Sequence, residues 1–271
     1  MARIRIGGII ARIIIILGLI FAIAPILWIV FCSFKSRVDI ISSPPKFVFT
    51  PVIDNYARVL QMDTIVQGLK NSLIVVPSTV ALGFLLGVPA AYAFARFSFK
   101  RKKDLRFFIL SMRFMPPIAV VIPFFTIWLR LGLLDTRVAL IVTYMTISVS
   151  AMIWLVIECF KRIPIEFEEA AQLEGLGPFQ VLVKISLKIA LPSILGMTIF
   201  VFILVWNEFF LAFILTSNKA VTMPVASAAF AVVGMEVPWG QICASITLLL
   251  LPPLVLSYFF MKYLPNIFSI K

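Results

Sequence analysis

The chain has 271 residues, of which 62% are hydrophobic and 13% are charged, and its mean hydropathy is +1.11. A soluble domain of this size is usually about 45–50% apolar and about 25% charged. The composition therefore excludes a water-soluble globular fold and indicates an all-α protein that crosses a membrane several times. A net charge of +12 would suggest nucleic acid in a soluble protein, but here it indicates basic loops on one side of a membrane, so no nucleic acid partner is expected.

Six segments are apolar and long enough to span a bilayer, which takes about 20 residues. The first follows basic residues, as in a signal peptide, but it is too long and no small-residue cleavage site follows it, so we expect it to be retained. We interpret residues 1–271 as a single transmembrane domain. Its predicted spans cover residues 11–34, 71–95, 105–129, 138–160, 191–215 and 241–262.

The first outer loop, residues 35–70, contains Ser42-Ser43-Pro44-Pro45, a run that favours extended and turn conformations. A short helix is predicted from Asp54 to Leu60. The loop is interpreted either as a plain surface loop or as part of a seat for an external partner.

Two spans carry residues that interrupt a regular apolar helix. Pro77, Gly83, Gly87 and Pro89 in the second span predict close packing against neighbouring helices and kinks in the helix. The third span holds Arg113, just before Met115-Pro116-Pro117. We interpret Arg113 as reaching the lipid headgroups from near the cytoplasmic end, and the alternative is that it lines a polar cavity.

The longest polar interruption lies between the fourth and fifth spans, at residues 161–190. Pro164 suits the first position of a helix, because its missing N–H costs nothing there. Glycines then allow a left-handed stop, and Pro178 starts a second helix. The pattern predicts a helix-turn-helix on the membrane surface, either a solvated linker or a contact surface. Its acidic residues and turn glycines are Glu166, Glu168, Glu169, Glu174, Gly175 and Gly177.

The fifth span contains Trp206-Asn207-Glu208. An ionisable residue deep in a span costs about 3 kcal/mol or more and usually faces a cavity or a partner. Glu208 is either an interfacial carboxylate near an aromatic belt or part of a polar transport path, where Asn207 would hydrogen-bond solute hydroxyls. The outer loop that follows has an apolar stretch, residues 225–233, that is too short to span and is interpreted as a re-entrant or lid-like helix.

The distribution of Lys and Arg predicts the orientation. One side of the predicted topology carries 15 of these residues and the other carries 8. The positive-inside rule then places both termini, the loop at residues 96–106 and the hairpin in the cytoplasm.

The hairpin resembles the EAA loop of permease subunits of ABC importers. The resemblance rests on Glu169-Ala170-Ala171, then Gly175, and Ile185 after nine further residues. Lys188 stands where the family usually has Pro. Asn71-Ser72-Leu73, Ala90–Phe97 and Trp206–Phe210 also match, and the chain looks most like the maltose-type carbohydrate permeases.

This resemblance implies that the hairpin docks on a cytoplasmic ATPase and that the fifth span lines the path. The residues implied in ATPase coupling are Glu168, Glu169, Ala170, Ala171, Gly175 and Gly177. Those implied in the substrate path are Trp206, Asn207 and Glu208.

The implied function is that of a permease subunit in the bacterial cytoplasmic (inner) membrane, forming half of a path for a carbohydrate-type solute such as a sugar, polyol or glycerol-phosphate. The implied partners are an ABC ATPase dimer, a second permease subunit in a heterodimer, an external solute-binding protein and membrane lipid. Energy for transport would then come from ATP hydrolysis on a separate chain.

We do not expect this chain to hydrolyse ATP or to catalyse another reaction itself. There is no Gly-x-x-x-x-Gly-Lys-Ser/Thr run and no histidine, and Cys32, Cys159 and Cys243 show no metal-ligand spacing. We therefore predict no catalytic residue, metal, cofactor or disulfide. One alternative is a stand-alone secondary transporter or channel, which paired intramembrane charges or an inverted repeat would indicate. The other is a membrane scaffold without transport.

Overall fold

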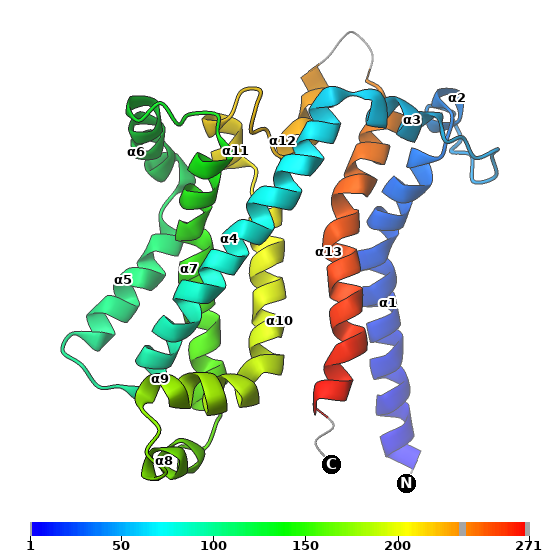
Figure 1. Ribbon diagram of the computed structural model, residues 1–271. Coiled ribbons are helices and arrows are strands. Elements are labelled where there is room, and N and C mark those ends of the chain that lie inside the picture. The colour runs from blue at the N-terminus through cyan, green and yellow to red at the C-terminus, as the bar shows by residue number, and fades with distance from the viewer. Residues whose placement is uncertain (1, 233–236, 269–271) are drawn as a thin grey trace. The chain divides into compact units, whose positions relative to one another are not determined.

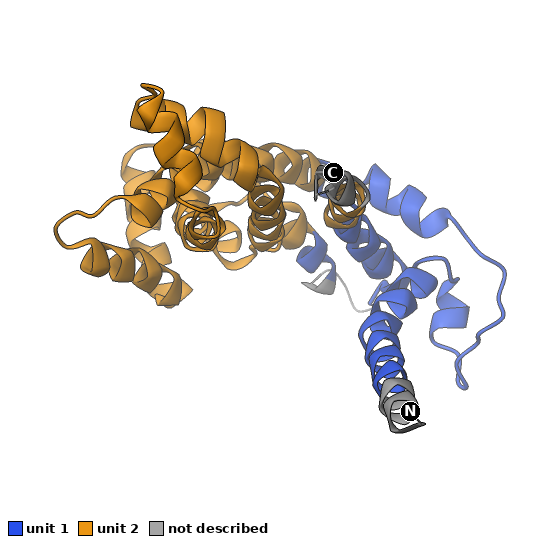
Figure 2. Ribbon diagram, turned by 90° about the horizontal axis from the view of Figure 1, so that it is seen from below, with its two compact units in different colours: residues 1–66, 227–251 blue, residues 67–226, 252–271 orange. Residues whose placement is uncertain are grey.

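The computed structural model of the chain describes residues 2–232 and 237–268, and every regular element in these ranges is a helix (Figure 1). Five of these helices are long and apolar enough to cross a membrane, or six if a bent pair is counted as one span. The predicted all-α membrane class is confirmed. The chain forms two compact units, residues 1–66 with 227–251 and residues 67–226 with 252–271 (Figure 2).

The first unit contains the first span and the outer loop. None of the apolar window in the first helix is buried within the described part of the chain. The short helix predicted from Asp54 to Leu60 is present. The helices are α1 (Ala2–Ser33), α2 (Arg37–Ile40) and α3 (Asp54–Gln61).

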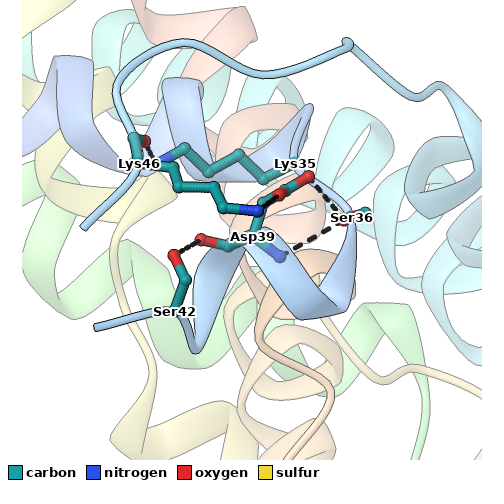
Figure 3. A network of polar contacts seen from close by, with 5 residues as sticks. All are labelled: Lys35, Ser36, Asp39, Ser42 and Lys46. Carbon is teal, nitrogen blue, oxygen red and sulfur yellow. Dashed lines mark hydrogen bonds and ion pairs between the residues drawn. The ribbon is translucent and has the colours of Figure 1, made fainter. Parts of the chain in front are cut away.

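The outer loop is tied down by polar contacts around a buried lysine (Figure 3). Lys35 is only 1% exposed, its Nζ donates to the carbonyl of Lys46 over 2.6 Å, and it lies 4.7 Å from the ring centroid of Trp28. Lys46 in turn pairs with Asp39 over 2.9 Å. Ser36 caps α2 and donates to the same carboxylate. The loop is therefore an ordered structure and not merely a connection.

The second unit is built around α7 (Arg137–Lys161), whose apolar window is 56% buried, the largest share among the candidate spans. Thr136 caps its start by accepting a hydrogen bond from the N–H of Ala139. The helix packs against α10 (Leu187–Trp206). The second span is α4 (Asp63–Arg96), which lies in this unit from residue 67 onward.

Two glycines let α4 and α7 approach closely. A Cβ atom on Gly83 would collide with Ser148, and one on Gly87 would lie 2.7 Å from the Cβ of Met152. Neither position has room for a side chain, so the close packing predicted from these glycines is confirmed.

The third predicted span, residues 105–129, is formed by two helices and not by one. α5 (Lys102–Phe114) and α6 (Pro117–Arg130) meet at a bend of 91°. Pro116 forces Met115 into an extended conformation, with ψ 131°, and Pro117 then restarts a helix at its first turn. The two consecutive prolines therefore break the span near its middle.

The fifth span also differs from its predicted range, residues 191–215. The continuous helical stretch runs from Pro178 to Trp206, because the second hairpin helix continues directly into the helix of this span. Lys188 retains the backbone N–H that a proline would lack, so the helix passes this point without a break. The successive segments are α9 (Pro178–Val181), the π-helical turn η1 (Leu182–Ser186), α10 and, after a non-helical break, α11 (Phe210–Leu215).

The last elements follow the second outer loop. The apolar stretch predicted at residues 225–233 forms α12 (Met223–Ala228) and the 3₁₀ turn η2 (Ala229–Val232), and residue 233 lies outside the described part. The sixth span is α13 (Trp239–Phe268).

Candidate functional site

The hairpin consists of α8 (Glu166–Leu173), a glycine turn and α9. Gly175 has φ +88°, the left-handed conformation that stops α8, and the N–H of Leu176 donates to the carbonyl of Ala171 over 3.2 Å. Gly177 has φ −70° and caps α9, whose first residue is Pro178. The predicted helix-turn-helix is present, but only Gly175 supplies the left-handed stop.

The two faces of α8 differ sharply. Glu168 and Ala171 are buried, at 2% and 5% exposure, whereas Glu169 and Ala170 are exposed. Four of the residues expected to act in coupling therefore form two pairs. Glu168 and Ala171 pack α8 against the rest of the second unit, whereas Glu169 and Ala170 are free to contact another protein.

Glu168 is the centre of a buried polar cluster. Its Oε1 accepts from Nε of Arg96 over 2.9 Å and from Oγ of Ser186 over 2.8 Å. Its Oε2 accepts from the hydroxyl of Tyr92 over 3.1 Å. Arg96 also donates to the carbonyl of Ile163, in the short segment between α7 and α8, over 2.8 Å. One carboxylate thus joins α8 to the end of α4 and to the π-helical turn.

A cavity of about 200 Å³, lined by apolar and by charged residues, lies at the break in the third span. Arg113, in the last turn of α5, and Glu208, in the break between α10 and α11, both line it, together with Thr146 of α7. Arg113 is exposed and is one of the residues that line this cavity, as the alternative interpretation expects, and its reach to the lipid headgroups stays a prediction. Non-helical backbone at membrane depth is tolerated where it lines such a cavity.

The three predicted path residues have different environments. The carboxylate of Glu208 accepts from the N–H groups of Leu211 and Ala212, over 2.9 and 3.2 Å, so it caps α11 as well as lining the cavity. The side chain of Asn207 is exposed and donates to a carbonyl one turn earlier. Trp206 is 1% exposed and stacks on Phe202, so its ring belongs to the core.

Sequence reasoning missed Arg96, Tyr92, Ser186 and Thr146 as site residues. Arg96 and Tyr92 belong to the Ala90–Phe97 segment that matched the permeases, and that match was the available signal for them. Ser186 and Thr146 carry no such signal, because only the fold brings them to a carboxylate or a cavity.

Comparison with known proteins decides the family. Residues 83–266 match the family described as "Binding-protein-dependent transport system inner membrane component". The chain belongs to this permease family. The match includes the hairpin, the break in the third span and all three predicted path residues.

Relatives of this permease include a trehalose transport system permease protein of Mycobacterium tuberculosis (strain CDC 1551 / Oshkosh). The two are 33% identical over 244 residues, 89% of each chain. A trehalose/maltose transport system permease protein of Thermococcus litoralis (strain ATCC 51850 / DSM 5473 / JCM 8560 / NS-C) is 29% identical over 260 residues, 93% of each chain.

Among solved structures, this permease is similar to a chain in the crystal structure of a bacterial ABC transporter that imports the acidic polysaccharide alginate. The TM-score is 0.77 at 23% identity, with 96% of each chain covered. This likeness supports the fold of the permease.

Proposed function

We propose that this permease is one of two membrane subunits of an ATP-driven ABC importer for a sugar or polyol. The names of its relatives support the solute class, since they include transport systems for trehalose, maltose and sulfoquinovosyl glycerol. The chain contains no phosphate-binding loop, so hydrolysis is assigned to a separate ATPase dimer. A soluble binding protein on the outer side delivers the solute.

The observation that carries this proposal is the division of α8 into two faces. Its inner face is fixed to the second unit through Glu168, while its outer face presents Glu169 and Ala170. A helix held on one side and open on the other suits a surface on which a second protein docks. The small side chain of Ala170 would allow close approach, and Glu169 would pair with a basic residue of the ATPase.

The cavity at the broken span is proposed as the solute path through this subunit. Arg113 supplies hydrogen-bond donors, Glu208 supplies acceptors, and exposed Asn207 lies next to Glu208 in the chain. Trp206 is proposed to hold this region in place rather than to contact solute, because it is buried. Alternating access would move the cavity between the two sides of the membrane.

Co-purification tests the docking part of this proposal. The permease, its partner subunit and the ATPase are expressed together, and an affinity tag on the permease recovers the complex. Ala170→Trp is expected to reduce recovered ATPase by about tenfold or more, since a large side chain at a close interface costs more than about 1.4 kcal/mol. Gln172→Trp, at another exposed position of α8, measures how much of the effect belongs to position 170. Full ATPase recovery with Ala170→Trp would contradict docking on this face.

A further inference from the structure

Glu168 is unlike the other carboxylates of α8, because it is buried and fully engaged inside the permease. Three side chains donate to it, from Tyr92 and Arg96 at the end of α4 and from Ser186 in η1, over 2.8 to 3.1 Å. At 2% exposure it offers no surface to an ATPase. Its place directly before the Glu169-Ala170-Ala171 run therefore needs an explanation other than direct contact.

The cluster of Glu168, Tyr92, Arg96 and Ser186, called the joint below, connects α8 to the neighbouring helices. Charge-assisted hydrogen bonds are shorter and stronger than neutral ones, and a buried carboxylate that loses its partner is strongly destabilised. The guanidinium of Arg96 donates both to Glu168, which lies in α8, and to the carbonyl of Ile163, which lies just before α8. A displacement of α8 is thus opposed at the end of α4 unless α4 moves with it.

The π-helical turn extends the joint to a second helix. In η1 the hydrogen bonds close over five residues, and the N–H of Leu187 donates to the carbonyl of Leu182. This widened turn brings Ser186 to face Glu168, and α10 follows without a break. Such π-turns occur frequently at functional sites. Motion of α8 is therefore delivered to both α4 and α10.

These two helices, together with α13, line a large groove in the second unit. It has a volume of about 800 Å³ and is apolar, with Phe84 of α4 and Phe202 of α10 among its lining residues. A change in the angle between α4 and α10 changes the width of this groove. The joint at Glu168 is thus placed where a movement of the hairpin would act on the membrane-embedded part.

We propose that Glu168 is a positioning residue that transmits the movement of α8 to α4 and α10 through Arg96 and Ser186, and that it does not contact the ATPase. This inference rests on the proposed coupling function. It assigns different tasks to two adjacent carboxylates, with Glu169 binding the ATPase and Glu168 passing its motion inward.

The experiment compares Glu168→Gln with Glu169→Gln in the assembled complex, reconstituted in lipid vesicles with its binding protein and trehalose as the probe solute. Recovered ATPase, ATP hydrolysis and solute uptake are measured on the same preparations. Glu168→Gln is expected to retain the ATPase and to lower solute transported per ATP by at least about fivefold. Glu169→Gln is expected to lower the amount of recovered ATPase, while the complexes that still form transport the normal amount of solute per ATP.

Two further variants separate transmission from simple loss of folding. Ser186→Ala removes one donor from the joint without leaving a buried charge unpaired, so it is expected to fold and to lower the transport ratio by a smaller factor. Arg96→Lys preserves the charge and is expected to keep a higher ratio than Arg96→Gln.

Either of two results overturns the inference: loss of ATPase from Glu168→Gln to the same extent as from Glu169→Gln, or an unchanged transport ratio in both Glu168→Gln and Ser186→Ala. Failure of the underlying coupling function looks different, because then the unaltered permease would recover no ATPase or would transport without hydrolysis.

Discussion

Gly175 is the residue on which the shape of the hairpin depends. Its φ of +88° is rarely adopted by residues with a side chain, yet a Cβ atom there would meet nothing within 4 Å. The requirement for glycine is thus one of backbone conformation and not of space. Gly177, two residues on, is equally open but has an ordinary φ.

We therefore expect Gly175→Ala to destabilise the hairpin by about 1–2 kcal/mol, the cost of a left-handed non-glycine residue. Gly177→Ala is the matched control and is expected to have no such effect. Hydrogen exchange of the α8 amides in the purified complex measures the difference. Equal exchange rates in the two variants would contradict the conformational argument.

Asp135 holds the second outer loop in place. Its carboxylate accepts from the N–H groups of Ser217, Asn218, Lys219 and Ala220, over 2.9 to 3.1 Å. Partial burial acts to raise the pKa of Asp135, but the four amides outweigh it and hold this pKa below the ordinary value of 3.8. The ionised form is thus the one that binds the loop.

Because the folded pKa of Asp135 is lowered, its stabilisation is present above pH 3.8 and is lost as the pH falls through the folded pKa. Asp135→Asn tolerates the φ of +58° at this position and is expected to cost about 1–2 kcal/mol at pH 7. The deficit should shrink below pH 3.8. Thermal unfolding in detergent at pH 7 and at pH 3 tests this, and a deficit that is equal at both would argue against a charge effect.

At the scale of elements, the contact between α4 and α7 depends on glycine for a different reason. Here the conformation is ordinary and space is lacking, since a Cβ on Gly87 would lie 2.7 Å from that of Met152. Gly196 in α10 is also helical, but the nearest atom to its Cβ position belongs to Phe260 at 3.5 Å, an ordinary contact.

Gly87→Ala is therefore expected to lower the stability of the permease by about 1–3 kcal/mol, the usual cost of overpacking. Gly196→Ala is expected to be neutral or slightly stabilising, because alanine favours a helix. Melting temperatures of the two variants in the same detergent make the comparison. A larger loss from Gly196→Ala would show that the packing of α4 on α7 is not the limiting contact.

The break between α5 and α6 shows which features of this region the local sequence predicts and which it does not. Arg113 and the prolines after it were visible as unusual residues in a span, and they indicate a local disturbance. The 91° bend and the shared cavity with Glu208 could not be read from them, because Glu208 lies 95 residues further along the chain. The cavity that Arg113 lines depends on that distant partner.

For the whole molecule, the orientation in the membrane remains a prediction from the excess of Lys and Arg on one side. It places the hairpin and both termini in the cytoplasm, and the terminal residues 1 and 269–271 lie outside the described part. The coupling proposal depends on this orientation, since ATP is available only inside the cell.

Cysteine labelling tests the orientation. In a variant whose three cysteines are replaced by serine, Leu173→Cys, at a position that is 90% exposed, is expected to react with an impermeant maleimide only in inside-out vesicles. Lys219→Cys, exposed in the second outer loop, is expected to react only in right-side-out vesicles. The reverse pattern would place the hairpin outside and remove the basis of the proposed function.

Composition and hydropathy by themselves determined that this chain is an α-helical membrane protein, because apolar runs of bilayer length leave the backbone no other fold in lipid. The local pattern of acidic residues, alanines and glycines likewise specified the hairpin, since caps and turns depend on near neighbours. Tertiary structure alone decided that Glu168 points inward and Glu169 outward, and that Arg113 shares a cavity with Glu208. Those outcomes depend on contacts between helices far apart in the chain, which hydrophobic periodicity does not encode.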